Sequence, residues 1–277
     1  MTRTGTVLDE IIDGVREDLE PRRAAVPAAQ IRELAAQAAP ARDARSALAG
    51  DGTTMGLIAE VKRASPSKGQ LADIPAPAEL AGIYARHGAG TISVLTEQRR
   101  FRGSLADLDA VRAEVSIPVL RKDFVVDPYQ VYEARAHGAD LILLIVAALD
   151  DAQLHDLDAL VTELGMQALV ETHTEEELER ALALDAGIIG VNARNLKTLD
   201  VDLQRAAGLL RRIPPGPLTI GESAVASVAD VEAYAAAGAD AVLVGEALVT
   251  AGDPAESVAA FRAVARRGRA RQEGARA

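Results

Sequence analysis

Acidic and basic side chains alternate along one stretch that follows the apolar run 56–59. The stretch reads Glu60-Val61-Lys62-Arg63-Ala64-Ser65-Pro66-Ser67-Lys68-Gly69. Side chains alternate between the two faces of an extended strand, so Glu60 and Lys62 should point to the same side. Charged side chains are rarely buried unless they are paired. The stretch is therefore either a solvated strand end or one wall of a chemically active site.

Five further apolar runs also end in polar residues. These residues are Arg121, Lys122 and Asp123; Glu171; Asn192, Arg194 and Asn195; Glu222 and Ser223; and Gly245 with Glu246. Two amines and two or three carboxylates in one pocket could supply both the acid and the base steps of a reaction near neutral pH, because their surroundings shift their pKa values. Such a pocket needs a fold that brings the ends of six strands together.

A repeat along the chain predicts the strands of that fold. Glycines at positions 88, 138, 187 and 238 each end a helical segment just before a short apolar strand, and they lie about fifty residues apart. A second set of strands lies halfway between them. We expect eight strands in all, at 56–62, 91–95, 117–124, 141–145, 166–171, 188–191, 218–222 and 241–245.

Helical segments with recognisable N-terminal signals alternate with these strands. The signals are Ser104, Asp127-Pro128, Thr174, Ser227 and Asp253-Pro254. Strict alternation implies parallel strands, and eight evenly spaced units favour a closed (β/α)8 TIM barrel of the α/β class over an open doubly wound sheet. No Gly-x-Gly-x-x-Gly follows the first strand, which argues against a dinucleotide-binding fold. In a barrel the polar strand ends meet at one opening, so the active-site interpretation is favoured.

The chain is expected to form one domain over residues 1–277. The barrel should occupy 56–265, and a helical extension over 1–50 should cover it. Apolar residues at helical spacing predict a first helix over 6–20, beginning at Thr6. An alanine-rich segment over 28–48 is predicted to be a second helix. The extension could cover one end of the barrel or form an interface.

Composition excludes several classes of protein and site. The net charge is −11, which disfavours nucleic-acid and acidic-membrane binding, and the arginines near the C-terminus are best explained as a solvated helix end. The absence of cysteine excludes disulfides and thiolate metal sites. The four histidines form no metal-binding pattern, and His87 and His137 are expected to cap helices. No stretch suits a signal peptide or a membrane span, so we expect a cytoplasmic protein. We also expect it to be a monomer.

The loops after the last two strands predict a phosphorylated ligand. They read Gly221-Glu222-Ser223-Ala224 and Val244-Gly245-Glu246-Ala247, and loops at these positions of a barrel commonly bind phosphate through backbone amides. Glu246 carries a negative charge, so its backbone amide rather than its side chain should face the phosphate. His173, two residues after Glu171, is a possible further residue of the site.

The sequence resembles the indole-3-glycerol phosphate synthase family over nearly its whole length. Besides the stretch 60–69, the resemblance is carried by Val7-Leu8-Asp9-Glu10-Ile11-Ile12, Leu95-Thr96-Glu97, Phe101-Arg102-Gly103-Ser104, Leu120-Arg121-Lys122-Asp123-Phe124, Leu169-Val170-Glu171 and Asn192-Ala193-Arg194-Asn195-Leu196. It implies a lyase of tryptophan biosynthesis that closes 1-(2-carboxyphenylamino)-1-deoxyribulose 5-phosphate to indole-3-glycerol phosphate, losing carbon dioxide and water. It implies that no cofactor is needed.

The resemblance also implies roles for individual residues. Lys122 would be the general acid and Glu171 the general base, Lys62 would hold the substrate and could share the acid role, and Glu60 and Asn192 would orient these amines and the sugar. Further substrate-binding residues would be Ser65, Phe101, Phe124, Leu143, Arg194, Glu222 and Ser223. Phosphate-binding residues would be Lys62, Ser65, Ala224, Gly245 and Glu246. The apolar members of these sets could equally be core residues.

Two positions depart from the family pattern. Ala224 stands where a glycine is usual, which adds a methyl group near the phosphate and disfavours a positive φ. An apolar residue often follows the glutamate at 171, whereas this chain continues with Thr172 and His173. Two alternatives stay open: a barrel that binds a phosphorylated ligand without turnover, and a sugar-phosphate isomerase barrel. The isomerase family normally uses a cysteine, which this chain lacks.

Overall fold

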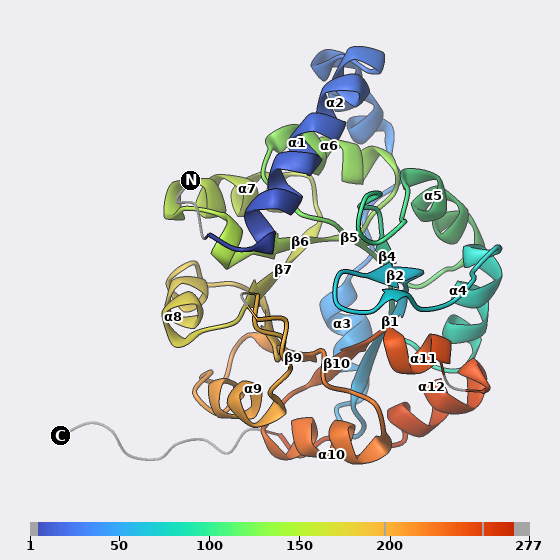
Figure 1. Ribbon diagram of the computed structural model, residues 1–277, viewed down its shortest axis with the longest axis vertical. Helices are drawn as coiled ribbons and strands as arrows, with labels where there is room; N and C mark the ends of the chain where they lie inside the picture. The colour runs from blue at the N-terminus through green and yellow to red at the C-terminus, as the bar shows by residue number, and fades with distance from the viewer. Residues whose placement is uncertain (1–4, 197, 251, 269–277) are drawn as a thin grey trace.

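Eight parallel strands close into a barrel surrounded by helices, as predicted (Figure 1). The computed structural model describes residues 5–196, 198–250 and 252–268. The ring of strands runs β1-β10-β9-β8-β7-β6-β5-β4. Their bounds are β1 Gly56–Val61, β4 Thr91–Leu95, β5 Val119–Lys122, β6 Leu141–Ile145, β7 Gln167–Thr172, β8 Ile188–Asn192, β9 Leu218–Glu222 and β10 Ala241–Val244. The predicted fold class is therefore confirmed.

Burial on both faces explains why these strands are nearly continuous apolar runs. All five residues of β6 are buried, because one face fills the barrel interior and the other packs against the surrounding helices. The ring closes where β1 pairs with β10, with Gly56 opposite Ala241. Since all eight strands run the same way, their C-terminal ends meet at one opening.

Short capped helices connect the strands. Their bounds are α4 Pro77–Arg86, α5 Leu105–Glu114, α6 Pro128–Ala136, η1 Val146–Ala148, α7 Asp151–Glu163, α8 Glu175–Ala183, α9 Leu203–Leu210, α10 Val228–Ala236, α11 Glu246–Thr250 and α12 Pro254–Arg262. All five predicted N-terminal signals directly precede or begin a helix. Within the described residues, no helix is both long enough and apolar enough to cross a bilayer.

The N-terminal extension folds into three helices, α1 Val7–Ala25, α2 Ala28–Gln37 and α3 Ala44–Ala49. The prediction of one helix over 28–48 was wrong, because the chain leaves the helix at Ala38, passes through Pro40, and begins α3 with Asp43 as its N-cap. Helix α1 starts after Thr6 as predicted but runs past Glu20 to Ala25. Its last turn packs on α6, where the Tyr129 hydroxyl donates to the carbonyl oxygen of Val26 at 2.9 Å.

A small antiparallel hairpin between β1 and α4 was not predicted. It consists of β2 Ala64–Ser65 and β3 Gly69–Gln70, with Ser65 opposite Gly69. Two-residue strands are too short to give an alternating pattern in the sequence. The hairpin carries the segment 65–68 to the edge of the barrel opening, where it borders the cavity described next.

Candidate active site

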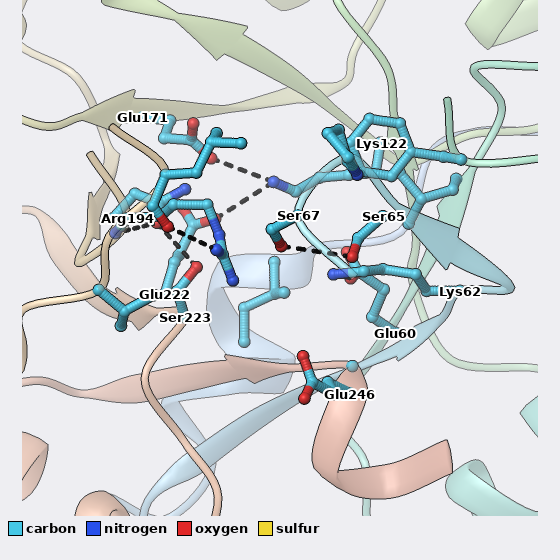
Figure 2. Close-up of a pocket in the computed structure, with 18 of the residues that line it drawn as sticks. Glu60, Lys62, Ser65, Ser67, Lys122, Glu171, Arg194, Glu222, Ser223 and Glu246 are labelled. Carbon is cyan, nitrogen blue, oxygen red and sulfur yellow. Dashed lines mark hydrogen bonds and ion pairs between the residues drawn. The ribbon is translucent and has the colours of Figure 1, made fainter. Parts of the chain in front are cut away.

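A cavity of about 710 Å³ occupies the C-terminal opening of the barrel. Every residue to which the sequence analysis assigns a catalytic, substrate-binding or phosphate-binding role lines it, and Figure 2 shows many of them converging from different strands. These residues are Glu60, Lys62, Ser65, Phe101, Lys122, Phe124, Leu143, Glu171, Asn192, Arg194, Glu222, Ser223, Ala224, Gly245 and Glu246. The strand-end rule thus gathered side chains that share one cavity.

Four charged side chains form the innermost layer of the site. Glu60, Lys122, Glu171 and Glu222 come from β1, β5, β7 and β9, which are alternate strands of the ring. Alternate strands contribute the side chains of one layer inside a (β/α)8 barrel. The three carboxylates are almost completely buried, with exposed fractions of 3%, 2% and 1% in chain order. Charged side chains therefore occupy a layer of the barrel interior that is normally filled by aliphatic residues.

Lys122 lies between two carboxylates. Its Nζ is 3.0 Å from Oε2 of Glu171 and 3.3 Å from Oε2 of Glu222 (Figure 2). Burial lowers the pKa of Lys122, but the negative charges of Glu171, Glu222 and Glu60 more than offset that effect and leave the pKa above its usual value. The free site therefore holds Lys122 as an ammonium ion, which can donate a proton.

The two partners of Lys122 differ in their affinity for a proton. Burial raises the pKa of Glu171, yet the charges of Lys122 and then His173 bring it well below the usual range. Burial also raises the pKa of Glu222; Lys122 opposes this, but the nearby charge of Glu171 adds to it, and the pKa stays above its usual value. The pair thus combines an ionised carboxylate with one that holds a proton more readily, as acid and base chemistry requires.

Glu60 and Lys62 form the second ion pair of the cavity. Nζ of Lys62 is 3.2 Å from Oε1 of Glu60, which confirms that strand alternation places both on one face. The Ser93 hydroxyl on the adjacent strand donates to Oε2 of Glu60 at 3.2 Å. Glu60 is therefore held from both sides, and it can orient the Lys62 amine toward the cavity.

Two glycines make room for the buried carboxylates. A Cβ atom at Gly190 of β8 would lie 2.0 Å from Oε1 of Glu222. A Cβ atom at Gly245, just after β10, would lie 2.6 Å from Oε1 of Glu60. Both distances are far below van der Waals contact, so the bare backbone at these positions sets where the carboxylates can lie.

Asn192 joins two loops at the opening. Its Oδ1 accepts hydrogen bonds from the backbone N–H of Arg194 at 3.0 Å and from the Ser223 hydroxyl at 2.8 Å. The Arg194 side chain in turn donates to the carbonyl oxygen of Leu199 at 2.9 Å. These bonds fix the loops after β8 and β9, whereas the two amines are held by Glu60, Glu171 and Glu222.

An aromatic pair forms the apolar side of the cavity. The ring centroids of Phe101 and Phe124 are 6.0 Å apart. Phe101 is fixed through the loop after β4, where the buried carboxylate of Glu97 accepts backbone N–H groups from Arg99, Arg100 and Phe101 at 2.7 to 3.0 Å. Because the Glu97 carboxylate holds the backbone of this loop, Phe101 has a defined position, and a planar ligand could pack against its ring.

The opposite end of the cavity is formed by the loops after β9 and β10. Ser223 and Ala224 both have positive φ values, of 62° and 58°. Ala224 therefore adopts a left-handed backbone conformation that suits glycine better, at the position where the sequence departs from the family pattern. The Glu246 side chain is paired with Lys68 of the hairpin, which neutralises its charge at this end of the site.

The sequence prediction missed part of the site and misjudged Arg121 and Asn195, neither of which lines the cavity. Helix α1 lines the cavity through Val7, Leu8 and Ile11, but an apolar stripe at helical spacing does not reveal which surface it will cover. Arg121 was grouped with the strand-end residues, yet it is fully buried outside the barrel wall and pairs with Glu133 at 2.9 Å. Strand alternation from Lys122 could have predicted this.

Two of the histidines cap helices, and a third is buried behind the cavity. His87 and His137 are the C-cap residues of α4 and α6, as predicted. His173 lies behind Glu171 and does not line the cavity. Within the described ranges, no group of three or more His, Asp or Glu side chains is placed to hold a metal ion.

Comparisons with known proteins agree with this barrel and its opening. Residues 8–261 match a family model described as Indole-3-glycerol phosphate synthase. A relative of that name from Arthrobacter sp. (strain FB24) is 63% identical over 261 residues, which cover 93% of this chain and 96% of the relative. Another of that name from Micrococcus luteus is 62% identical, with coverage of 93% and 97%.

Solved structures of other enzymes share the fold. 3-Hexulose-6-phosphate synthase from Salmonella typhimurium aligns with a TM-score of 0.58 at 18% identity, covering 75% of this chain and 97% of that one. At such low identity the likeness concerns the fold alone. The family model and the close relatives, in contrast, span the whole barrel and every residue of its charged opening, and the chain belongs to the indole-3-glycerol phosphate synthase family.

Proposed function

We propose that this chain closes the indole ring of indole-3-glycerol phosphate from 1-(2-carboxyphenylamino)-1-deoxyribulose 5-phosphate, with Lys122 as the general acid and Glu171 as the general base. The family is that of the carboxy-lyases of tryptophan biosynthesis. The observation that carries the residue roles is the buried ammonium of Lys122 between two carboxylates whose pKa values are shifted in opposite directions.

The reaction needs protons to be delivered to the ketone oxygen and removed from the carbon next to the former ketone carbon. The ring carbon that bears the carboxylate attacks the ketone carbon, and Lys122 protonates the ketone oxygen as the new carbon–carbon bond forms. Carbon dioxide then leaves with its bonding electrons returned to the ring. The hydroxyl, protonated by a lysine ammonium, departs as water, and Glu171 takes a proton from the adjacent carbon that is bonded to nitrogen, so that the five-membered ring becomes aromatic. Groups held within hydrogen-bond distance of the reacting atoms can contribute about 10²- to 10⁴-fold to such steps.

The remaining residues would bind the two ends of the substrate. Phe101, Phe124 and Leu143 offer an apolar surface for the anthranilate ring. At the other end, Ser65, Ala224, Gly245 and the backbone amide of Glu246 would surround the phosphate, with Lys62 supplying charge for the phosphate or the substrate carboxylate. Glu60 would orient Lys62, and Asn192 with Ser223 and Arg194 would hold the loops against the sugar.

Turnover of the substrate tests the proposal directly. Purified protein should convert it to a product with indole fluorescence, and Lys122→Met should abolish nearly all turnover while the protein still binds the substrate in calorimetry. Binding by the wild-type chain without turnover at any pH from 6 to 9 would instead favour the phosphate-ligand-binding alternative. Unchanged turnover in Lys122→Met would show that Lys122 is not the general acid.

We also propose that the chain is a single domain that works as a cytoplasmic monomer. The acidic composition and the absence of cysteine are compatible with that setting. Size-exclusion chromatography with light scattering should give a mass near 29.0 kDa. A mass twice as large would show a dimer.

A further inference from the structure

His173 is a buried histidine that the proposed reaction does not use. It follows the end of β7, and its side chain is 3% exposed. Its Nε2 atom lies 3.3 Å from Oε1 of Glu171, and its Nδ1 atom lies 3.0 Å from Oε2 of Glu177. The imidazole ring therefore bridges the proposed base and a carboxylate outside the cavity.

The surroundings of the ring favour its charged form. A neutral imidazole has one nitrogen that can only accept, whereas both nitrogens here face carboxylate oxygens, which are acceptors. The contact with Glu177 has hydrogen-bond length, and the contact with Glu171 is a somewhat longer ion pair. Burial lowers the pKa of His173, but the two glutamates outweigh burial and raise it to about 9.

The start of helix α8 fixes the ring in place. Glu177 lies in the first turn, and its Oε2 also accepts the backbone N–H of His173 at 2.7 Å. Thr174 caps the same turn by accepting the N–H of Glu177 at 3.2 Å. One carboxylate thus holds both the backbone and the ring of His173, and the ring has little freedom to turn away from Glu171.

Glu171 consequently has a cation at each oxygen. Oε2 faces Lys122, and Oε1 faces His173. On its far side Lys122 contacts Glu222, so the charged groups form a line from Glu222 through Lys122, Glu171 and His173 to Glu177. When Lys122 gives its proton to substrate, the inner carboxylates lose that cation. His173 remains as the positive charge beside Glu171.

We propose that His173 is a positioning residue for the reaction: as an imidazolium held by Glu177, it fixes Oε1 of Glu171, turns Oε2 toward Lys122 and the substrate, and keeps the carboxylate ionised after Lys122 has transferred its proton. The inference rests on the proposed role of Glu171 as base. It adds a cation that takes no part in bond making or breaking.

The pH dependence of kcat distinguishes this role from simple packing. His173→Gln keeps an N–H donor of similar reach but removes the charge. Without a neighbouring cation the pKa of Glu171 should rise, since one nearby opposite charge shifts a carboxyl pKa by about 1 to 3. The acid limb of the kcat profile should therefore move up by about one pH unit or more, with about a tenfold loss of kcat near the wild-type acid limb.

Matched variants control for the loss of an imidazole and for misfolding. His155→Gln removes a histidine that is 74% exposed and should leave the profile unchanged. Glu177→Gln keeps the His173 ring but weakens the contact that holds the ring and favours its charged form. This variant should therefore shift the acid limb in the same direction but by less. An acid limb of His173→Gln that coincides with the wild-type limb would overturn the proposal, whatever the stability of the variant.

Nuclear magnetic resonance of ¹⁵N-histidine tests the charge without any turnover. The chain has four histidines, so single substitutions of the other three assign the His173 signals. The wild-type protein should show His173 as an imidazolium at pH 7.5, and a neutral ring at that pH would overturn the inference. If the wild-type protein shows the imidazolium but no turnover, the proposed function fails while the cation is still present.

Discussion

At the scale of single residues, Lys122 has a structural task besides the proposed chemical one. Its ammonium is the cation between Glu171 and Glu222. Lys122→Met leaves both carboxylates buried without it, and removing one partner of a buried ion pair costs about 3–5 kcal/mol. Unfolding in denaturant should show that loss at pH 7.5. A loss below about 1 kcal/mol would mean that the carboxylates simply take up protons.

Lys122→Arg separates the two tasks of this residue. The guanidinium keeps the positive charge but does not release a proton in proteins. We therefore expect the variant to recover much of the stability that Lys122→Met loses, while kcat stays at least about 100-fold below wild type. Recovery of both stability and turnover would show that charge alone is needed at this position.

Ala224 stores backbone strain at the proposed phosphate end of the site. Its φ of 58° costs an L-residue roughly 1–2 kcal/mol, whereas the extra freedom of a glycine in the unfolded chain costs about 0.4–1 kcal/mol. Ala224→Gly should therefore raise the free energy of unfolding by up to about 1.6 kcal/mol. It should also lower KM by letting backbone approach phosphate more closely.

Ala226 provides the control within the same loop. Its φ is not positive, so Ala226→Gly should show only the entropic cost and lower the stability by about 0.4–1 kcal/mol. Equal effects of the two substitutions in thermal unfolding would contradict the assignment of strain to Ala224.

At the scale of elements, β8 shapes the site through Asn192 and through Gly190, which has no side chain. A methyl group at Gly190 would collide with the Glu222 carboxylate, which would have to shift within the cavity that it lines. Gly190→Ala should cost about 1–3 kcal/mol through overpacking and should displace Glu222 from Lys122. Misplacement by about 1 Å can cost 100-fold in rate, so kcat should fall by about tenfold or more.

Gly187, in the turn just before the same strand, is the matched control for that substitution. A Cβ atom there meets nothing within 4 Å, and its φ is not positive. Gly187→Ala should therefore leave kcat unchanged and the melting temperature equal to or slightly above that of wild type. A Gly190→Ala enzyme with wild-type kcat would show that Glu222 tolerates displacement.

Elements with a strong period or a clear cap could be predicted from the sequence, and short or packing-dependent ones could not. The eight strands and five helix starts follow from apolar runs, glycine stops and cap residues, which are local signals. The hairpin β2–β3 has two residues a strand, and the surface covered by α1 depends on contacts with segments far away in the chain. His173 was noticed, but its link to Glu177 requires knowing how β7 turns into α8.

At the scale of the whole molecule, the barrel fold predicts which residues gather at the site. It does not predict which of them are in contact. Parallel strands must bring their C-terminal ends together, so residues from 60 to 246 meet in one cavity. Which charges touch depends on the stagger between strands. Glu171 lies opposite Gly190, and Asn192 lies opposite Glu222, and neither register can be derived from strand lengths alone.

The buried line of charges also couples the stability of the fold to pH. The pKa of His173 is raised from 6.5 to about 9 on folding, so its contribution is fully present below pH 6.5 and is lost as pH rises through 9. The free energy of unfolding of wild type should therefore fall toward that of His173→Gln between pH 6.5 and 10. Denaturant unfolding of both proteins at several pH values measures the difference. Parallel curves would mean that folding does not raise the pKa of His173, because a histidine whose proton affinity is unchanged by folding contributes no pH dependence.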